Sequence, residues 1–306
     1  MASKTLRIEF VGTSLKRLSR HLLILFIAFL AVLLPGCAQF LLRTATPSLI
    51  PNITASFFEE CDPELAKVAI PSNLKLLEGL LKNDPQNREI LVSLAMGFAG
   101  YSLLFVEAED PKRASLFYLR ARSYGFQALG EKGRVLANPE LSRDELQSRL
   151  KALSDAEYRA LFWSTLSWNA WISLNLDQPR ALSEIALAEA CLNKLFEMDS
   201  SYLHGLPHIL MGVLFSARPP LLGGNPDKAR AHFEEAVKEN SGKFFLTQVY
   251  YARYYAVRVQ DKALFERLLQ GVMSNDPADL KDVCLINRVM QQQAQRLIEQ
   301  SEDLFI

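Results

Sequence analysis

Helical periodicity among the apolar residues constrains this chain more than any other feature. Beyond residue 60, apolar side chains recur three and four positions apart, as in Leu91, Leu94 and Phe98. Another such stripe consists of Phe245, Val249, Ala252, Ala256 and Val259. Residues at this spacing share one face of an α-helix, whereas the alternation typical of strands is nearly absent. The chain is therefore predicted to be all-α.

Turn-forming pairs divide the helical region into segments. Proline is tolerated in the first turn of a helix, and a preceding Asp or Asn can cap the free N–H groups there. Asp62-Pro63-Glu64 is expected to start a helix in this way, with the acid near the positive helix end. The other pairs are Asp84-Pro85, Asp110-Pro111, Gly223-Gly224, Asn225-Pro226 and Asp276-Pro277.

An internal repeat indicates how the helices are arranged. With Gly97 aligned to Gly212, the coinciding residues are Pro111 and Pro226, Ala114 and Ala229, Tyr118 and Phe233, and Ala121 and Ala236. Alanines let a helix approach its partner closely, while the aromatic side chain fills the groove beside them. The pattern resembles the second helix of a tetratricopeptide repeat, with a weaker version at Ala181, Ile185 and Ala188. Residues 61–306 are thus predicted to form a tetratricopeptide-like solenoid of helical hairpins.

The amino terminus has the order of a secretory signal peptide. Basic residues, the last of them Arg20, precede an uncharged apolar run over residues 22–34. This run is shorter than the roughly 18–20 residues that cross a bilayer as a helix. It leads into Leu34-Pro35-Gly36-Cys37, which resembles the lipobox of bacterial lipoproteins, although Pro35 departs from the small residues usual there. The resemblance implies removal of residues 1–36 and attachment of acyl chains, such as palmitate, to Cys37.

Two other interpretations of this segment stay open. An apolar stretch continuing through Leu42 would be an uncleaved membrane anchor, and Cys37 would be incidental if another peptidase removed the signal. For a lipoprotein, Ala38 after the cysteine implies, by resemblance to sorting rules in diderm bacteria, an outer-membrane location facing the periplasm. Residues 37–60, with Pro47 and Pro51, are then expected to be a lipidated tether.

Composition limits the classes of protein that remain. Hydrophobic residues make up 49% of the chain and charged residues 22%, and 34 basic residues balance 34 acidic ones. Such a chain can bury a large core, which argues against disorder and against a polytopic membrane protein. The lack of a basic excess argues against binding to nucleic acid.

Cysteine number restricts the possible cross-links. Beyond Cys37 the chain has Cys61, Cys191 and Cys284, so at most one disulfide can form among them, and its pairing is left open. Cys191 lies among Ala188, Leu192 and Leu195, and is predicted to be a buried small hydrophobic residue.

Motifs for catalysis or cofactor binding are missing from the sequence. HExxH, GxSxG, P-loop, GxGxxG and CxxC patterns do not occur. His204 and His208 are four apart, but Gly205 and Pro207 between them disfavour the regular helix that a shared metal site would need. The chain is therefore predicted not to be an enzyme and to bind no metal or cofactor.

Longer stretches resemble a particular family. They are residues 76–87, which include Glu78-Gly79; residues 100–107; the aromatic stretch 162–171; and the loop 218–224 with the following Ala229 and His232-Phe233. Their composition and their order along the chain are similar to the T components of tetratricopeptide-protein-associated TRAP transporters, over about residues 60–300.

This resemblance implies a periplasmic lipoprotein with a helical body, often a homotrimer, with an opening through each protomer. It also implies association with the solute-binding P component of the transporter, and transfer of a small hydrophobic or amphipathic solute to it. The alternative that the residues leave open is a general tetratricopeptide scaffold that docks proteins in the cell envelope.

Aromatic side chains with polar tips, together with one arginine, are the candidates for lining a ligand passage. Trp168 and Trp171 share a helix face, and Arg218 heads a loop from which its guanidinium could bind a carboxylate. The full set is Tyr101, Phe105, Trp168, Trp171, Arg218 and Tyr254. The competing interpretation is that the aromatic stripes fill a core and that Arg218 is a solvated loop residue or a helix C-cap.

Overall fold

The computed structural model describes residues 49–305 apart from residue 139, so the predicted signal peptide and Cys37 lie outside the described residues. Helices dominate the described part of the chain and no strand occurs in it, which confirms the all-α prediction. The longer helices are α2 (Pro63–Leu81), α3 (Arg88–Tyr101), α4 (Pro111–Ala128), α7 (Tyr158–Leu174), α8 (Pro179–Met198), α9 (Tyr202–Ala217), α10 (Pro226–Glu239), α12 (Lys262–Ser274) and α13 (Cys284–Glu299). The shorter ones are α5 (Glu131–Leu136), α6 (Arg143–Lys151), α11 (Phe245–Tyr250) and α14 (Ser301–Leu304), the π-helices η1 (Ser102–Val106) and η4 (Tyr251–Ala256), and the 3-10 helices η2 (Asp155–Glu157), η3 (Pro220–Leu222), η5 (Pro277–Asp279) and η6 (Lys281–Val283).

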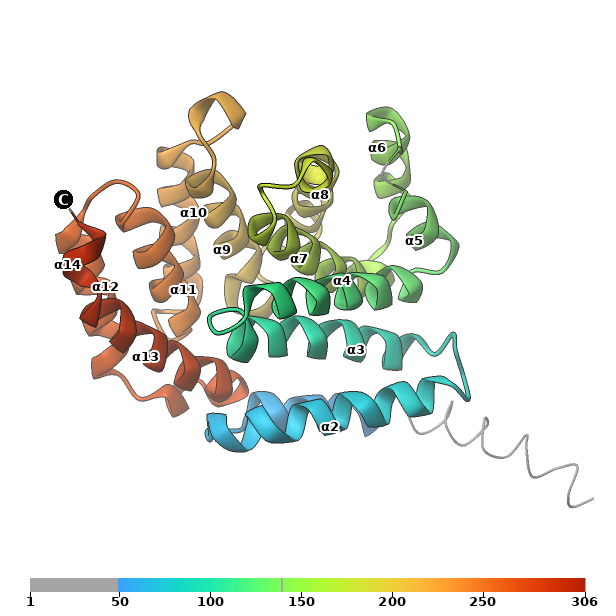
Figure 1. The fold of residues 1–306 in the computed structure, drawn as a ribbon, viewed down its shortest axis with the longest axis horizontal. Coiled ribbons are helices and arrows are strands. Elements are labelled where there is room, and N and C mark those ends of the chain that lie inside the picture. The colour runs from blue at the N-terminus through green and yellow to red at the C-terminus, as the bar shows by residue number, and fades with distance from the viewer. Residues whose placement is uncertain (1–48, 139, 306) are drawn as a thin grey trace, which may run out of the picture. The chain divides into compact units, whose positions relative to one another are not determined.

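Helices that follow one another in the sequence pack side by side (Figure 1). α2 lies against α3, α3 against α4, α7 against α8, and α9 against α10. Contacts of α4 with α7, and of α9 with η4, join successive pairs, while α5 and α6 lie between α4 and α7 in the chain. Adjacent pairs of this kind fit the predicted hairpins, and a regular tetratricopeptide solenoid stays an interpretation of them.

Capping residues begin α2, α4, α10 and η5 where the sequence predicted, and α2 and α10 serve as examples. Asp62 accepts hydrogen bonds from the backbone N–H groups of Glu64 and Leu65, at 2.9 and 3.2 Å, at the start of α2. Asn225 accepts one from the Lys228 N–H, at 3.0 Å, at the start of α10. In both helices a proline follows the cap, where its missing N–H leaves no helix hydrogen bond unmade.

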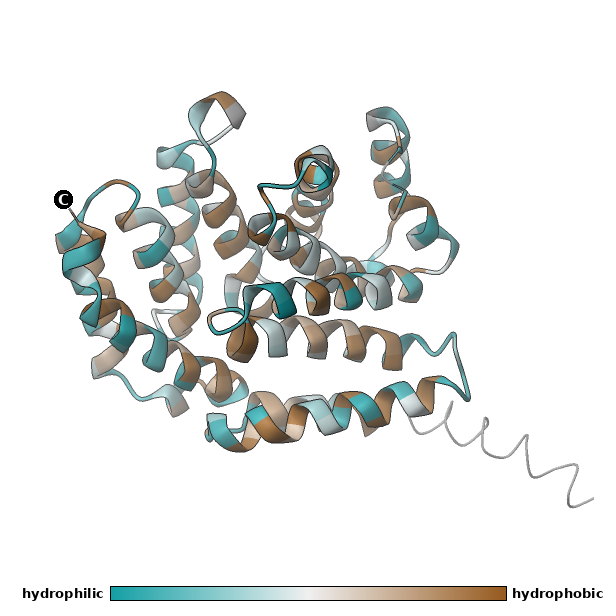
Figure 2. Ribbon diagram, viewed as in Figure 1, coloured by the Kyte–Doolittle hydropathy of each residue, from teal (hydrophilic) through white to brown (hydrophobic). Residues whose placement is uncertain are grey.

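Alanines at the predicted repeat positions are fully buried, which allows close packing of the helices that carry them. They are Ala114 and Ala121 on α4, Ala181 and Ala188 on α8, and Ala229 and Ala236 on α10. The aromatic residues between them, Tyr118 and Phe233, are also buried. Figure 2 shows the resulting contrast, because α3 and α9 carry many apolar residues whereas α6 is mostly hydrophilic.

The two aligned glycines have different neighbours. A Cβ on Gly212 would lie 2.8 Å from the ring of Phe233, on the partner helix α10. A Cβ on Gly97 would instead lie 2.5 Å from the side chain of Leu74, on the preceding helix α2. Equal spacing in the sequence therefore does not give these glycines equivalent packing roles.

Two helices change from α to π geometry before they end. The Glu107 N–H donates to the Ser102 carbonyl at 2.8 Å in η1, and the Val257 N–H donates to the Ala252 carbonyl at 3.2 Å in η4. Each π turn contains an extra residue, which changes the side that later residues face. Val259 was predicted on the buried stripe but is 38% exposed, because the helix ends at Ala256 and Val259 lies in the turn that follows.

A further helix, Leu49–Phe58, precedes α2 and belongs to the same compact unit. Its Ile50 is buried, so part of the segment expected to be a tether packs into the body. A disulfide joins Cys61, just after this helix, to Cys284 at the start of α13. Cys191 is free and buried, which confirms its prediction.

One stretch of the described residues, Arg88–Val106, is long and apolar enough to cross a membrane. It comprises α3 and η1, and its residues Ile90, Leu91 and Leu94 are buried among neighbouring helices. Burial of this kind makes α3 a core helix of the described structure, because core helices satisfy the same test of length and composition.

Loss of the disulfide should destabilise the fold. The bond joins residues 223 positions apart. Removing a cross-link of this kind typically lowers the free energy of unfolding by about 2–5 kcal/mol. The double variant Cys61→Ala/Cys284→Ala should therefore unfold at a lower urea concentration than the parent. Dithiothreitol should lower the urea midpoint of the parent to that of the double variant and leave the midpoint of the double variant unchanged. A parent whose midpoint does not change on reduction would contradict the pairing.

Close packing at Gly212 should make it intolerant of a methyl group. Gly212→Ala should lower the free energy of unfolding by about 1–3 kcal/mol, because the new Cβ would clash with the Phe233 ring. Gly79→Ala is the matched control, since nothing lies within 4 Å of a Cβ there. That control should raise the free energy of unfolding by about 0.5–1 kcal/mol through helix propensity. Urea denaturation measures both changes in the free energy of unfolding, and equal changes in the two variants would contradict the close packing at Gly212.

Candidate functional site

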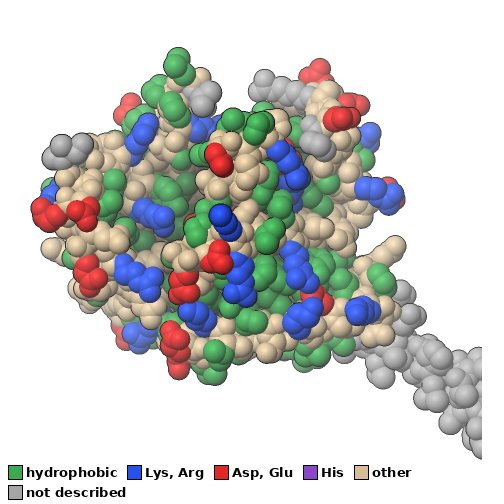
Figure 3. Space-filling model, in the orientation of Figure 1, with side chains coloured by type: hydrophobic (Ala, Val, Ile, Leu, Met, Phe, Trp, Pro, Cys, Tyr) green, Lys and Arg blue, Asp and Glu red, His purple; other side chains and the backbone are tan. Residues whose placement is uncertain are grey.

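A cavity of about 620 Å³ lies among α7, α8, α9 and α11. Figure 3 shows the surface hollowed between the α9–α10 pair and the α7–α8 pair, with apolar side chains inside the hollow. Six of the apolar lining residues are Leu103, Leu166, Ile185, Leu206, Leu210 and Val213. A space of this size and polarity is typical of sites for small molecules, which usually measure about 300–1,000 Å³.

Helical spacing explains how the wall is built. On α9, Leu206, Leu210 and Val213 follow one another at four and three positions, so they lie on the same face. On α7, the residues facing the cavity include the small Ala170 and Ser173. Small side chains on that face of α7 leave volume that larger ones would fill.

Charged and phenolic groups also line the cavity. Arg218 Nη1 donates to Glu189 Oε2 at 2.5 Å, so these two opposite charges are paired with each other. Glu107 accepts a hydrogen bond from the Tyr118 hydroxyl at 2.6 Å. The rings of Tyr250 and Tyr254 also line the cavity, with their centroids 5.2 Å apart.

Burial keeps the tyrosine hydroxyls near Glu107 neutral. Burial raises the pKa of Tyr118 well above its usual value, and the nearby Glu107 carboxylate raises it further. Burial likewise raises the pKa of Tyr250 and of Tyr254, with Glu107 adding to both shifts. The cavity therefore offers neutral phenols beside a carboxylate.

A second cavity, of about 100 Å³, lies between the helix Leu49–Phe58 and the helices α2 and α3. Four leucines line both cavities and therefore separate them: Leu103, Leu166, Leu206 and Leu246. The smaller cavity is almost wholly apolar in its lining, which includes Ile50 and Phe57 of the first described helix.

The structure separates the six candidate residues of the predicted passage. Arg218 and Tyr254 line the larger cavity, and Tyr101 lines the smaller one. Phe105 packs beside Tyr101, with ring centroids 5.6 Å apart, and lines neither cavity. Trp168 and Trp171 are buried and line neither cavity.

A buried ionic network accounts for Trp168. Its indole Nε1 donates to Glu184 Oε2 at 2.7 Å, and Arg122 Nη1 donates to the same oxygen at 2.7 Å. Arg180 Nε donates to the other oxygen at 3.1 Å. The Arg122 guanidinium also lies 4.0 Å from the Trp168 ring centroid, a cation–π contact. Trp168 therefore helps to satisfy a buried charge.

Opposing effects act on the ionisation of Glu184. Burial acts to raise its pKa, but attraction to Arg122 and the hydrogen bonds from Arg180, Trp168 and Arg122 outweigh burial, so the pKa lies below its usual value. The carboxylate therefore stays charged at neutral pH and balances the buried Arg122.

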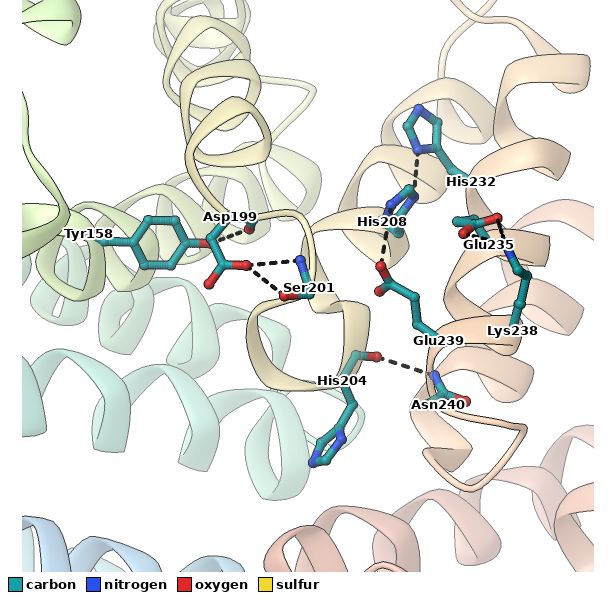
Figure 4. Close-up of polar contacts among 10 residues, drawn as sticks. All are labelled: Tyr158, Asp199, Ser201, His204, His208, His232, Glu235, Lys238, Glu239 and Asn240. Atoms are coloured by element: carbon teal, nitrogen blue, oxygen red, sulfur yellow. Dashed lines mark hydrogen bonds and ion pairs between the residues drawn. The ribbon is translucent and has the colours of Figure 1, made fainter.

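The histidines are divided between two places (Figure 4). Leu203, His204 and Gly205 have positive φ angles of 46°, 59° and 81°, so the start of α9 is not a regular helix, as the sequence predicted. His204 Nε2 lies 2.8 Å from Asp282 Oδ2. His208 Nδ1 instead lies 3.1 Å from Nδ1 of His232, a partner that the sequence spacing did not suggest.

Both histidines of the pair resist protonation. Burial lowers the pKa of His208, and burial with repulsion from His208 and Lys228 lowers the pKa of His232 to about 4. At neutral pH the pair is thus two neutral rings joined by one hydrogen bond. Within residues 49–305, no group of three or more His, Cys, Asp or Glu residues is arranged to hold a metal ion.

Several lining residues were not among the sequence candidates. Glu107 and Tyr250 are the polar ones, and the leucines of α9 form much of the wall. Periodicity indicated which residues share a helix face, but it gave no sign of which faces meet across a cavity.

Neutralising Glu184 should destabilise the protein strongly. Glu184→Gln leaves Arg122 buried without an opposite charge, and breaking a buried pair typically costs about 3–5 kcal/mol. Because the folded-state pKa of Glu184 is lowered, its contribution is present above the unfolded-state pKa and is lost as the pH falls through the folded-state value. The variant should therefore lose less stability between neutral and acidic pH than the parent does.

Urea denaturation across that pH range measures both effects. Glu234→Gln is a suitable control, because Glu234 forms an exposed pair with Arg230 on one face of α10 and should contribute little. A Glu184→Gln protein as stable as the parent at pH 7 would contradict the role given to the network.

Comparison with known proteins agrees with this architecture. Residues 59–305 match the family described as TRAP transporter T-component. A protein of Treponema pallidum (strain Nichols), described as uncharacterized, is 22% identical over 271 residues, which cover 83% of this chain and 84% of that protein. Because the family match spans nearly all of the helical body, the chain belongs to the TRAP transporter T components.

Proposed function

We propose that this T component binds a small hydrophobic or amphipathic solute in the cavity among α7, α8, α9 and α11 and passes it to the solute-binding P component. Membership of the family makes the chain an accessory subunit of a transporter, associated with the cell envelope, and not an enzyme. The observation that carries the more specific proposal is the apolar cavity of about 620 Å³ among α7, α8, α9 and α11. An apolar wall favours solutes with apolar surface, because such surface gains about 25 cal/mol per Å² on leaving water.

The lipid anchor belongs to the same proposal. The basic start, the apolar run and the lipobox-like residues before Cys37 support a lipoprotein attached through acylated Cys37. Several acyl chains together hold a protein firmly on a membrane, at about 0.8 kcal/mol per buried methylene. Ala38 supports the outer membrane as its location, with the body in the periplasm.

Exposed leucines near the cavity support a docking place for the P component. Leu176 and Leu182 line the cavity and are 52% and 50% exposed. Leu221, in η3 just after the lining residues Arg218 and Pro219, is 98% exposed. Apolar residues gathered where a cavity meets the surface suit a protein partner, since docking there would bring a solute and its recipient together.

Partner binding can be tested with one substitution. Leu221→Glu should weaken the complex with a TRAP-type P component by about tenfold or more, because a charge would be placed at an apolar contact. Leu116→Glu is the matched control. Leu116 is an exposed leucine too, at 66%, but it lies on α4 and does not line the cavity. Surface plasmon resonance would measure both, and equal weakening by the two variants would count against docking at η3.

Native mass spectrometry addresses solute, partner and oligomer together. The mature chain from residue 38 keeps every described residue and lacks the lipid. Alone, it should carry a co-purified small molecule and report whether it forms the homotrimer that the family resemblance implies. Mixed with the P component, it should give a complex. A protein that holds no small molecule and forms no complex would favour the general scaffold instead.

A further inference from the structure

One carboxylate of the larger cavity forms no ion pair among the described residues, although the charge of the nearby Arg253 acts on it. Glu107 lines the cavity directly after η1 and accepts the hydrogen bond of the Tyr118 hydroxyl at 2.6 Å. No ion pair joins it to a Lys or Arg among the described residues, whereas the neighbouring Glu109 pairs with Lys67 at 3.2 Å. A single hydroxyl leaves lone pairs of this carboxylate free for another donor.

The other charges of the lining offset each other. Glu189 and Arg218 form an ion pair at 2.5 Å, and the remaining charged residue of the lining is Glu107. The lining residues therefore carry a net negative charge, located at Glu107 and partly offset by Arg253 outside the lining. In an apolar cavity this charge attracts a cation more strongly than it would in water, and it repels a carboxylate.

Aromatic rings flank the same end of the cavity. Tyr250 and Tyr254 both line it, and both are close enough to Glu107 for its charge to raise their pKa. Faces of aromatic rings attract cations, and ammonium groups are commonly held between such rings and a carboxylate. Arg253 illustrates this property, because its guanidinium lies 5.3 Å from the Tyr254 ring centroid. Arg253 itself is exposed and is not part of the cavity lining.

We propose that Glu107, Tyr250 and Tyr254 form a cation-binding end of the cavity, and that the solute is an amphipathic amine or quaternary ammonium compound. Its apolar chain would lie along the leucines of α7 and α9, and its ammonium group would contact the Glu107 carboxylate and the two tyrosine rings. This inference rests on the proposed function, since it specifies the solute of the same cavity.

Three probes of equal chain length test the head group. Decyltrimethylammonium, decanoate and decanol, each below its critical micelle concentration, are titrated by calorimetry into the mature chain from residue 38. The ammonium probe should bind about tenfold or more tightly than decanol, and decanoate should bind more weakly than decanol. Decanol or decanoate binding as tightly as the ammonium probe would overturn the inference.

Variants locate the effect at Glu107. Glu107→Gln keeps the shape of the side chain and an acceptor for Tyr118 but removes the charge. It should therefore lower the affinity for the ammonium probe about tenfold and leave the affinity for decanol unchanged. Glu109→Gln, two residues along and outside the cavity lining, should change neither. Tyr254→Phe should keep the affinity for the ammonium probe, whereas Tyr254→Leu should lower it by removing the ring. An unaltered ammonium affinity in Glu107→Gln would refute the proposal.

The outcomes also separate this inference from the proposed function. Binding of decanol and decanoate without binding of the ammonium probe would leave a solute site but remove the cation-binding end. Failure of all three probes to bind a chain that retains its helical circular dichroism would overturn both.

Discussion

Close approach of paired helices at alanines is the constraint on which the rest of this structure depends. Ala114 and Ala121 on α4, like Ala229 and Ala236 on α10, have no exposed surface. With no side chain beyond Cβ, these positions let two helices pack at the short end of the usual 8–10 Å separation. The larger side chains must then be accommodated on other faces, and the cavity occurs where α7 and α8 meet α9 and α11 and side chains do not fill the space.

Helix α7 shows how one element can serve both a solid core and a cavity. Trp168 and Trp171 lie on one side, where Glu184 and Arg122 hold the indole of Trp168. The other side carries Leu166, Ala170 and Ser173, which line the cavity. Residues one or two positions apart on a helix face different directions. The sequence can therefore place large residues on one side of α7 and small residues on the other. The aromatic residues thus contribute rigidity, and the small ones contribute the cavity volume.

Sequence patterns predicted those features that depend on local chemistry. The cap at Asp62, the buried repeat alanines, the free buried Cys191 and the irregular start of α9 at Gly205 all follow from short-range rules. The Cys61–Cys284 pairing did not follow, because loop length places no limit on which distant residues meet. Neither did the roles of the tryptophans. Periodicity assigns Trp168 and Trp171 to one face, but whether that face meets a core or a cavity is decided by the neighbouring helices.

The charged end of the cavity depends on a change of helix type that no residue pattern announces. An α-helix turns about 100° per residue, so the extra residue of a π turn rotates everything after it by a comparable amount. Glu107 directly follows one such segment, η1, and Tyr254 lies within the other, η4. Continuation of either helix in α geometry would aim these side chains in other directions. Two departures from regular helix, far apart in the sequence, therefore bring a carboxylate and a phenol to the wall of one apolar cavity.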